Sequence, residues 1–86
     1  MRDHLTILKD IEQYLSSHGL SEDLLSLQDE VGASATGGEL CARVGSWLLT
    51  FQNDSEPDQA AKELITEFIK YCHFNALYPR GRSREN

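Results

Sequence analysis

Apolar residues recur along this chain at the three- and four-residue intervals that are typical of amphipathic α-helices. The clearest pattern lies between Thr36 and Phe51. Its apolar face is made by Leu40, Val44, Trp47, Leu48 and Phe51. Thr36 can cap this helix with its hydroxyl, and Glu39 can reach back to the Thr36 amide, which together form a capping box. Because this helix holds the only tryptophan of the chain, we predict that it is the central helix of a small bundle.

Three further segments show the same periodicity, and residues that end or begin helices separate them. The first helix should end at Gly19, since glycine readily adopts the left-handed conformation that follows a helix. Ser21 is the expected N-cap of the second helix. Residues 52–55 form the expected linker to the fourth helix, with Ser55 as its cap and Pro57 in its first turn. The sequence therefore predicts four helices, approximately over residues 3–17, 21–31, 37–52 and 56–75.

The apolar faces of these helices supply one core. The other three helices should bury Leu5, Leu8, Ile11, Leu15, Leu24, Leu27, Val31, Ala61, Leu64, Ile65, Phe68, Ile69 and Cys72. A chain of 86 residues is long enough for one such core and too short for two. We therefore predict an all-α fold, a compact four-helix bundle made of a single domain of residues 1–78. A flexible basic C-terminal tail, residues 79–86, follows it with Arg80, Arg82 and Arg84.

Small residues stand at two places in the central helix. Gly37 and Gly38 occupy its first two positions, where each glycine costs about 1 kcal/mol relative to alanine. We attribute them to a neighbouring helix or loop that crosses tightly there, with close approach of an anion or partner to the free amides as the alternative. A second face of the same helix consists of Ala42, Gly45, Ser46 and Leu49. Such a face lets another helix come close, as a central position requires.

The cysteines and the N-terminal segment indicate where the protein works. Cys41 and Cys72 both fall on apolar helical faces, so we expect buried free thiols, with a disulfide between packed helices as the alternative. No apolar run approaches the 18 residues of a membrane span. Asp3, Asp10 and Glu12 interrupt what would have to be the apolar part of a signal peptide. We therefore expect a cytoplasmic protein without a membrane span.

Acidic residues outnumber basic ones by fourteen to eight, which gives a net charge of −6. Such a body repels nucleic acid, which excludes direct nucleic-acid binding as a main role, and attracts basic partners. A solvated surface without a binding role is the alternative. Half of the acidic residues lie in the second helix and before the fourth, and we predict that they bind a partner: Glu22, Asp23, Asp29, Glu30, Asp54, Glu56 and Asp58.

Two of these acidic residues stand out by position. Asp29 and Glu30 lie toward the C-terminal end of the second helix, where negative charge is unfavourable. That helix contains no basic residue to pair with them. Their place in the sequence therefore favours a binding role over a purely structural one.

No pattern of residues indicates catalysis or metal binding. The sequence shows no Ser/His/Asp or Cys/His arrangement and no phosphate-binding loop. Cys72 and His73 are adjacent, but neighbours on a helix point about 100° apart, and no CxxC or HxxxH motif completes a metal site. We therefore expect a protein that is not an enzyme and that holds no metal or cofactor.

The helical hairpin that leads into AlaSerAlaThrGlyGlyGluLeu (33–40), and the amphipathic helix that continues to TrpLeuLeu (47–49), resemble small bacterial immunity proteins. These proteins neutralise the toxic nuclease domains of contact-dependent growth inhibition and related polymorphic toxin systems. The resemblance spans residues 5–75 and implies a cytoplasmic monomer that binds a basic toxin domain. It supplies no binding motif, so the predicted contact residues come from the charge pattern alone.

Two other classes of interaction protein fit the sequence. One is an adaptor or regulator that docks a partner through an apolar groove near Trp47, Tyr71 and Phe74. Binding by such an adaptor would be insensitive to salt. The other is a homodimer that uses the Gly45 face as its interface, and ultracentrifugation would then give twice the monomer mass.

Overall fold

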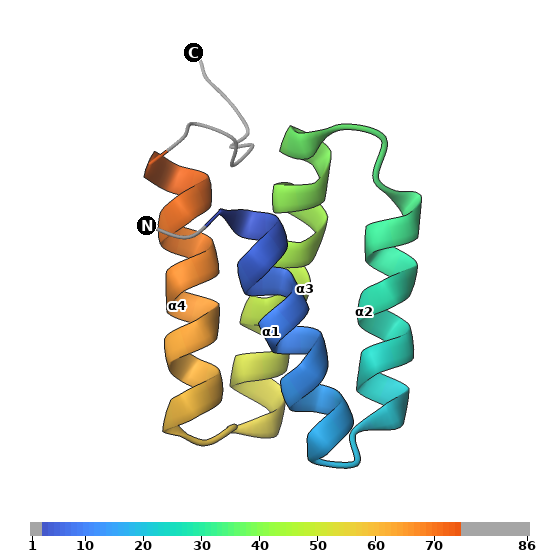
Figure 1. The fold of residues 1–86 in the computed structure, drawn as a ribbon, viewed down its shortest axis with the longest axis vertical. Helices are drawn as coiled ribbons and strands as arrows, with labels where there is room; N and C mark the ends of the chain where they lie inside the picture. The colour runs from blue at the N-terminus through green and yellow to red at the C-terminus, as the bar shows by residue number, and fades with distance from the viewer. Residues whose placement is uncertain (1–2, 75–86) are drawn as a thin grey trace.

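Four helices make up the part of the chain that the computed structural model describes, residues 3–74 (Figure 1). They are α1 (His4–Ser17), α2 (Ser21–Ala33), α3 (Gly37–Ser55) and α4 (Gln59–Phe74). The predicted all-α four-helix fold is thereby confirmed. The predicted tail, residues 79–86, lies outside the described residues, as do residues 75–78 at the end of the predicted domain.

Each helix runs antiparallel to the one before it, and the four form a closed ring (Figure 1). Helices α1 and α3 each pack against both α2 and α4, so α1 and α3 lie on one diagonal of the bundle. The connections α1–α2 and α3–α4 lie together at one end, which we call the hairpin end. The α2–α3 connection lies at the opposite end, with the start of α1 and the finish of α4.

The core is apolar and draws on all four helices. Its buried side chains are Ile7, Leu8, Ile11, Leu15, Leu27, Leu40, Cys41, Val44, Leu48, Phe51, Ile65, Phe68 and Cys72. The prediction that Leu5 is buried was wrong, because its side chain is 58% exposed. Helix α1 faces the core along the i, i+4 row that begins at Ile7, and this row leaves Leu5 on the outer side.

The predicted face of α2 is narrower than expected. Leu27 is its only buried residue, while Leu24 and Val31 are half-buried and Leu25 is 62% exposed. In α4, Leu64 and Ile69 likewise sit at the edge of the core. A helix at the corner of a four-helix ring contacts two neighbours and leaves the rest of its surface to solvent.

The turn between α1 and α2 follows the prediction at its glycine. Gly19 has φ +69°, and the amide of Leu20 donates to the carbonyl of Leu15 at 2.9 Å, which is the Schellman arrangement. Ser21 is not the cap of α2, because the helix already includes it and Leu20 holds the cap position without a side-chain bond. Directly after the Schellman turn, the carbonyl of Leu20 accepts a hydrogen bond from the Leu24 amide, which is the first bond of α2.

The connection between α3 and α4 differs from the prediction. Residues 52–55 belong to α3, which ends where Glu56 adopts a left-handed conformation with φ 47°. Pro57 disfavours the helical conformation in the residue before it, so the helix stops at this point and not at the polar cluster. Asp58, not Ser55, caps α4, since its Oδ1 accepts from the Ala61 amide at 3.1 Å.

The start of α3 confirms Thr36 as a cap, with its Oγ1 accepting from the Glu39 amide at 3.0 Å. The Glu39 carboxylate reaches back one residue further than predicted, to the amide of Ala35 at 2.8 Å. A side chain at Gly37 would meet nothing within 4 Å, so the tight crossing predicted at this glycine was wrong. This corner of the bundle is open at Gly37.

The second face of α3 is only partly covered. Gly45 is buried, whereas Leu49 is 40% exposed. Because the chain itself covers Gly45, this residue is not available as the interface of a second copy.

Cys41 and Cys72 are free and buried, as predicted. Burial raises the pKa of both thiols. They act as apolar core residues.

Candidate functional site

Five of the seven predicted contact residues gather at the hairpin end (Figure 1). This set, which we call the acidic end, consists of Glu22, Asp23, Asp54, Glu56 and Asp58. The antiparallel topology brings them together, because α2 and α4 begin where α1 and α3 finish. The sequence has no lysine or arginine between residues 10 and 42 or between 44 and 61, and Lys62 follows as the fourth residue of α4.

Asp58 has a structural role in the acidic end. Besides capping α4, it accepts a hydrogen bond from the Tyr14 hydroxyl at 3.0 Å, and its Oδ2 lies 4.0 Å from His18 Nε2. The bond from the Ala61 amide, and then that from Tyr14, lowers the pKa of the Asp58 carboxyl. Asp58 thus links the end of α1 to the start of α4, and its carboxylate is engaged by residues of the same chain.

The side chains of the other four residues of the acidic end form no hydrogen bond or ion pair with any residue between 3 and 74. Asp54 lies in the last turn of α3, where the helix dipole disfavours a carboxylate. Glu56 holds a left-handed conformation, which is uncommon for a residue with a side chain. Fold stability therefore does not account for these two carboxylates, whereas Glu22 and Asp23 suit the N-terminal turn of α2.

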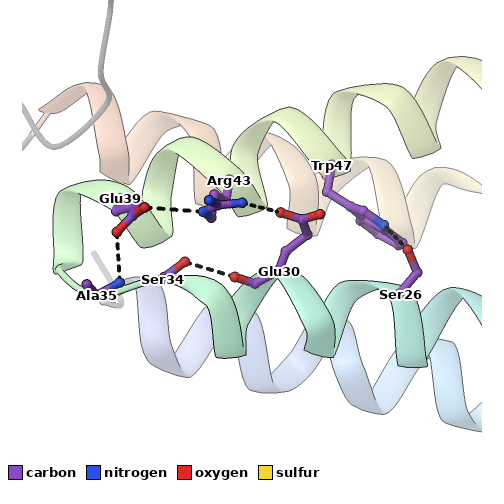
Figure 2. A network of polar contacts seen from close by, with 7 residues as sticks. All are labelled: Ser26, Glu30, Ser34, Ala35, Glu39, Arg43 and Trp47. Carbon is purple, nitrogen blue, oxygen red and sulfur yellow. Dashed lines mark hydrogen bonds and ion pairs between the residues drawn. The ribbon is translucent and has the colours of Figure 1, made fainter.

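Asp29 and Glu30 do not join the acidic end, because they lie further along α2 toward the opposite end of the bundle. Glu30 is paired: its Oε1 accepts from Arg43 Nη1 of α3 at 3.3 Å (Figure 2). The reasoning that Glu30 lacks a basic partner was therefore wrong, because the cation comes from another helix. No residue between 3 and 74 pairs with Asp29, so it remains a predicted contact residue apart from the others.

Arg43 is the centre of a polar seam between α2 and α3 (Figure 2). The seam consists of Ser26, Glu30, Ser34, Ala35, Glu39, Arg43 and Trp47. Arg43 Nε donates to Glu39 at 3.4 Å, and the two carboxylates, that of Glu30 first, raise the pKa of the guanidinium. Trp47 Nε1 donates to Ser26 Oγ at 2.9 Å, which fixes the indole against α2. Both carboxylates of the seam are thus neutralised within the chain.

A recess of about 130 Å³ lies between Trp47 and the hairpin end. It is lined by Asp23, Trp47, Thr50, Phe51, Asp54 and Ser55, and we call it the aromatic recess. The rings of Trp47 and Phe51 stack with their centroids 5.2 Å apart and 9° between their planes. Periodicity identifies both aromatic residues as core-facing but does not reveal which residues of α2 stand opposite them, so the recess was not predicted.

The groove predicted for an adaptor is divided between two sides of the bundle. Trp47 packs against α2 through Ser26, whereas the ring of Tyr71 contacts that of His4 of α1 in a tilted arrangement, with ring centroids 5.1 Å apart. Helices α2 and α4 lie on the second diagonal, so these contacts fall on different helix pairs. The side chain of Phe74 lies outside the described part of the structure.

Other kinds of site receive no support from the described residues. Between residues 3 and 74, no group of three or more His, Cys, Asp or Glu side chains is placed to hold a metal ion. No helix in the same part of the chain combines the length and apolar composition needed to cross a membrane. Comparison of the chain with protein-family models, curated proteins and solved structures finds no match.

Proposed function

We propose that this chain is an immunity protein that binds a basic toxin domain, a nuclease, through its acidic end and thereby neutralises it. The supporting observation is a set of four carboxylates, from Glu22, Asp23, Asp54 and Glu56, that have no partner between residues 3 and 74. Charge left uncompensated in this way is available to a cationic partner and attracts it from a distance.

The mechanism follows from the chemistry of carboxylates. Nucleases hold the phosphates of their substrate with lysine and arginine. Carboxylates from two helix ends and one connection present negative oxygens in place of those phosphates. Because the bundle holds these segments in fixed positions, little ordering is required when the partner docks. The nuclease then has its cationic surface occupied and cannot engage nucleic acid.

Capture from the source cell's lysate at low and high salt, followed by mass spectrometry, tests this proposal. The variant E22Q/D54N/E56Q removes three charges from the acidic end, and the matched control E12Q/E63Q/E67Q removes three from elsewhere. We expect the unmodified chain and the control to capture a basic domain whose nuclease activity they inhibit. The acidic-end variant should bind it at least tenfold more weakly, and binding by the unmodified chain should weaken as salt rises.

Two results would contradict the proposal. Capture of a partner without nuclease activity that stays bound at high salt would favour the adaptor. Equal loss of binding in both triple variants would show that net charge matters and the acidic end does not.

A further inference from the structure

Helices α2 and α3 already bind one guanidinium group, that of Arg43. In the polar seam, Arg43 lies between the carboxylates of Glu30 from α2 and Glu39 from α3, and the Glu30 carboxylate lies between Arg43 and the indole of Trp47 (Figure 2). A shallow depression on this side is lined by Glu30, Arg43, Trp47 and Thr50, among others. The cation of the seam therefore comes from the chain itself.

The aromatic recess repeats part of this arrangement on the other side of Trp47. Trp47 and Thr50 line both depressions, and α2 and α3 again contribute one carboxylate each, from Asp23 and Asp54. None of the described residues that line the recess is a lysine or arginine. The carboxylates and aromatic wall are present, while a cation is not supplied from within the described chain.

The size of the recess restricts its occupant. A volume of about 130 Å³ is well below the 300 to 1,000 Å³ of sites for drug-sized ligands, and it admits the head group of one side chain. Guanidinium is the cation that combines bidentate bonding to carboxylates with stacking on aromatic rings. Lysine offers a more strongly hydrated point charge and gains less from the aromatic wall.

We infer that the aromatic recess binds an arginine side chain of the basic partner, between Asp23 and Asp54 and against Trp47. The identity of the partner in this inference rests on the proposed function. The separate claim is that one arginine of that partner occupies a defined binding site on the acidic end. Asp23 is half-buried and Phe51 is 7% exposed, and both line the recess, so the recess is partly shielded from solvent.

The test is a titration of the full chain at low salt with a blocked pentapeptide, acetyl-Gly-Gly-Arg-Gly-Gly-amide, followed by NMR. Trp47 provides a unique indole N–H signal. We expect saturable shifts of this signal and of the amides at Asp23 and Asp54. The peptide with citrulline in place of arginine should cause no saturable shift, and the lysine peptide should bind more weakly than the arginine peptide.

Variants separate the recess from the general charge of the acidic end. D23N/D54N should raise the Kd of the arginine peptide about fivefold, since exposed charge pairs contribute modestly. E22Q/E56Q removes the same charge from the same end without touching the recess and should change the Kd less than twofold. Circular dichroism and Tm confirm that both variants fold.

Equal binding of the citrulline peptide, or equal weakening by both double variants, would overturn the inference. Failure of the proposed function has a different signature. Selective arginine binding at the recess, together with a lysate partner that is not a nuclease, would support the arginine site and contradict the proposal that the partner is a toxin. A nuclease partner that binds D23N/D54N as tightly as the unmodified chain would support the proposed function and contradict the arginine site in the recess.

Discussion

Helices α2 and α3 contribute carboxylates to both the polar seam and the acidic end, but the two regions differ in whether a cation within the chain pairs with those carboxylates. In the seam, Arg43 is within 3.4 Å of carboxylate oxygens of both Glu30 and Glu39. At the acidic end, Asp23 and Asp54 have no cation between residues 3 and 74. The charges of the seam are therefore neutralised within the chain, whereas those of Asp23 and Asp54 are not neutralised by any residue between 3 and 74.

This difference shows that the number of acidic residues does not by itself identify a binding surface. Asp58 and Glu30 belong to the same acidic set in the sequence, but both are engaged by residues from other helices. The other members of that set have no such partner between residues 3 and 74: Glu22, Asp23, Asp29, Asp54 and Glu56. Mutations that act on one region and spare the other make this comparison testable.

The largest effect is expected at Trp47, which borders both regions. W47A removes a half-buried indole and should lower the free energy of unfolding by about 2 to 3 kcal/mol, less than for a fully buried tryptophan. W47F keeps most of the packing and loses the bond to Ser26, so we expect a loss of about 1 kcal/mol. Urea titration measures both. If the two variants were equally unstable, the bond and not the packing would hold the indole.

Next in size is the loss of Asp58, the structural member of the acidic end. D58A removes the cap of α4 and the bond from Tyr14, and should lower the Tm by about 5 °C. D58N retains an oxygen that can cap and should lose less. Because the pKa of Asp58 is lowered in the fold, its charge stabilises the protein above the ordinary pKa near 4.

That contribution is lost as pH falls through the pKa of the folded state. The difference in Tm between the unmodified chain and D58N should therefore be present at pH 6 and shrink below pH 4. A difference that stays constant down to pH 2 would mean that the charge of Asp58 makes no contribution.

The smallest effect concerns the two neighbours on α2. E30K removes the partner of Arg43 and places a second cation beside it, so the Tm should fall by about 3 °C. D29K changes an exposed residue that pairs with nothing between residues 3 and 74, and should shift the Tm by about 1 °C or less. Thermal unfolding followed by circular dichroism measures both variants. Equal shifts would show that the ion pair of the seam contributes nothing to stability.

Local signals explain which parts of the fold were predicted. The spacing of apolar residues predicted the four helices. Gly19 marked the end of α1 and Thr36 the start of α3, because the effect of each residue acts within one helical turn. The end of α3 was misplaced because Pro57 acts on Glu56, while the polar cluster at 52–55 lies on a last turn that can remain helical.

The candidate site was predictable only in outline. Clustering of acidic residues near the helix ends was visible in the sequence, and antiparallel packing brings those ends together. The pairing of Arg43 with Glu30 and the position of Asp23 beside Trp47 join residues that are 13 and 24 positions apart in the numbering. Such pairings depend on the relative rotation of two packed helices, which the period of one helix does not determine.

An even number of antiparallel helices has a practical consequence for how this protein is handled. Helix α1 starts and α4 finishes at the end opposite the acidic end, at a distance of about 25 Å along helices of this length (Figure 1). A bead, a fluorophore or a fused domain joined beside His4 or Phe74 is therefore anchored away from the carboxylates. Immobilised in this way, the molecule presents its charged end outward, and either anchoring site serves for assays of partner capture.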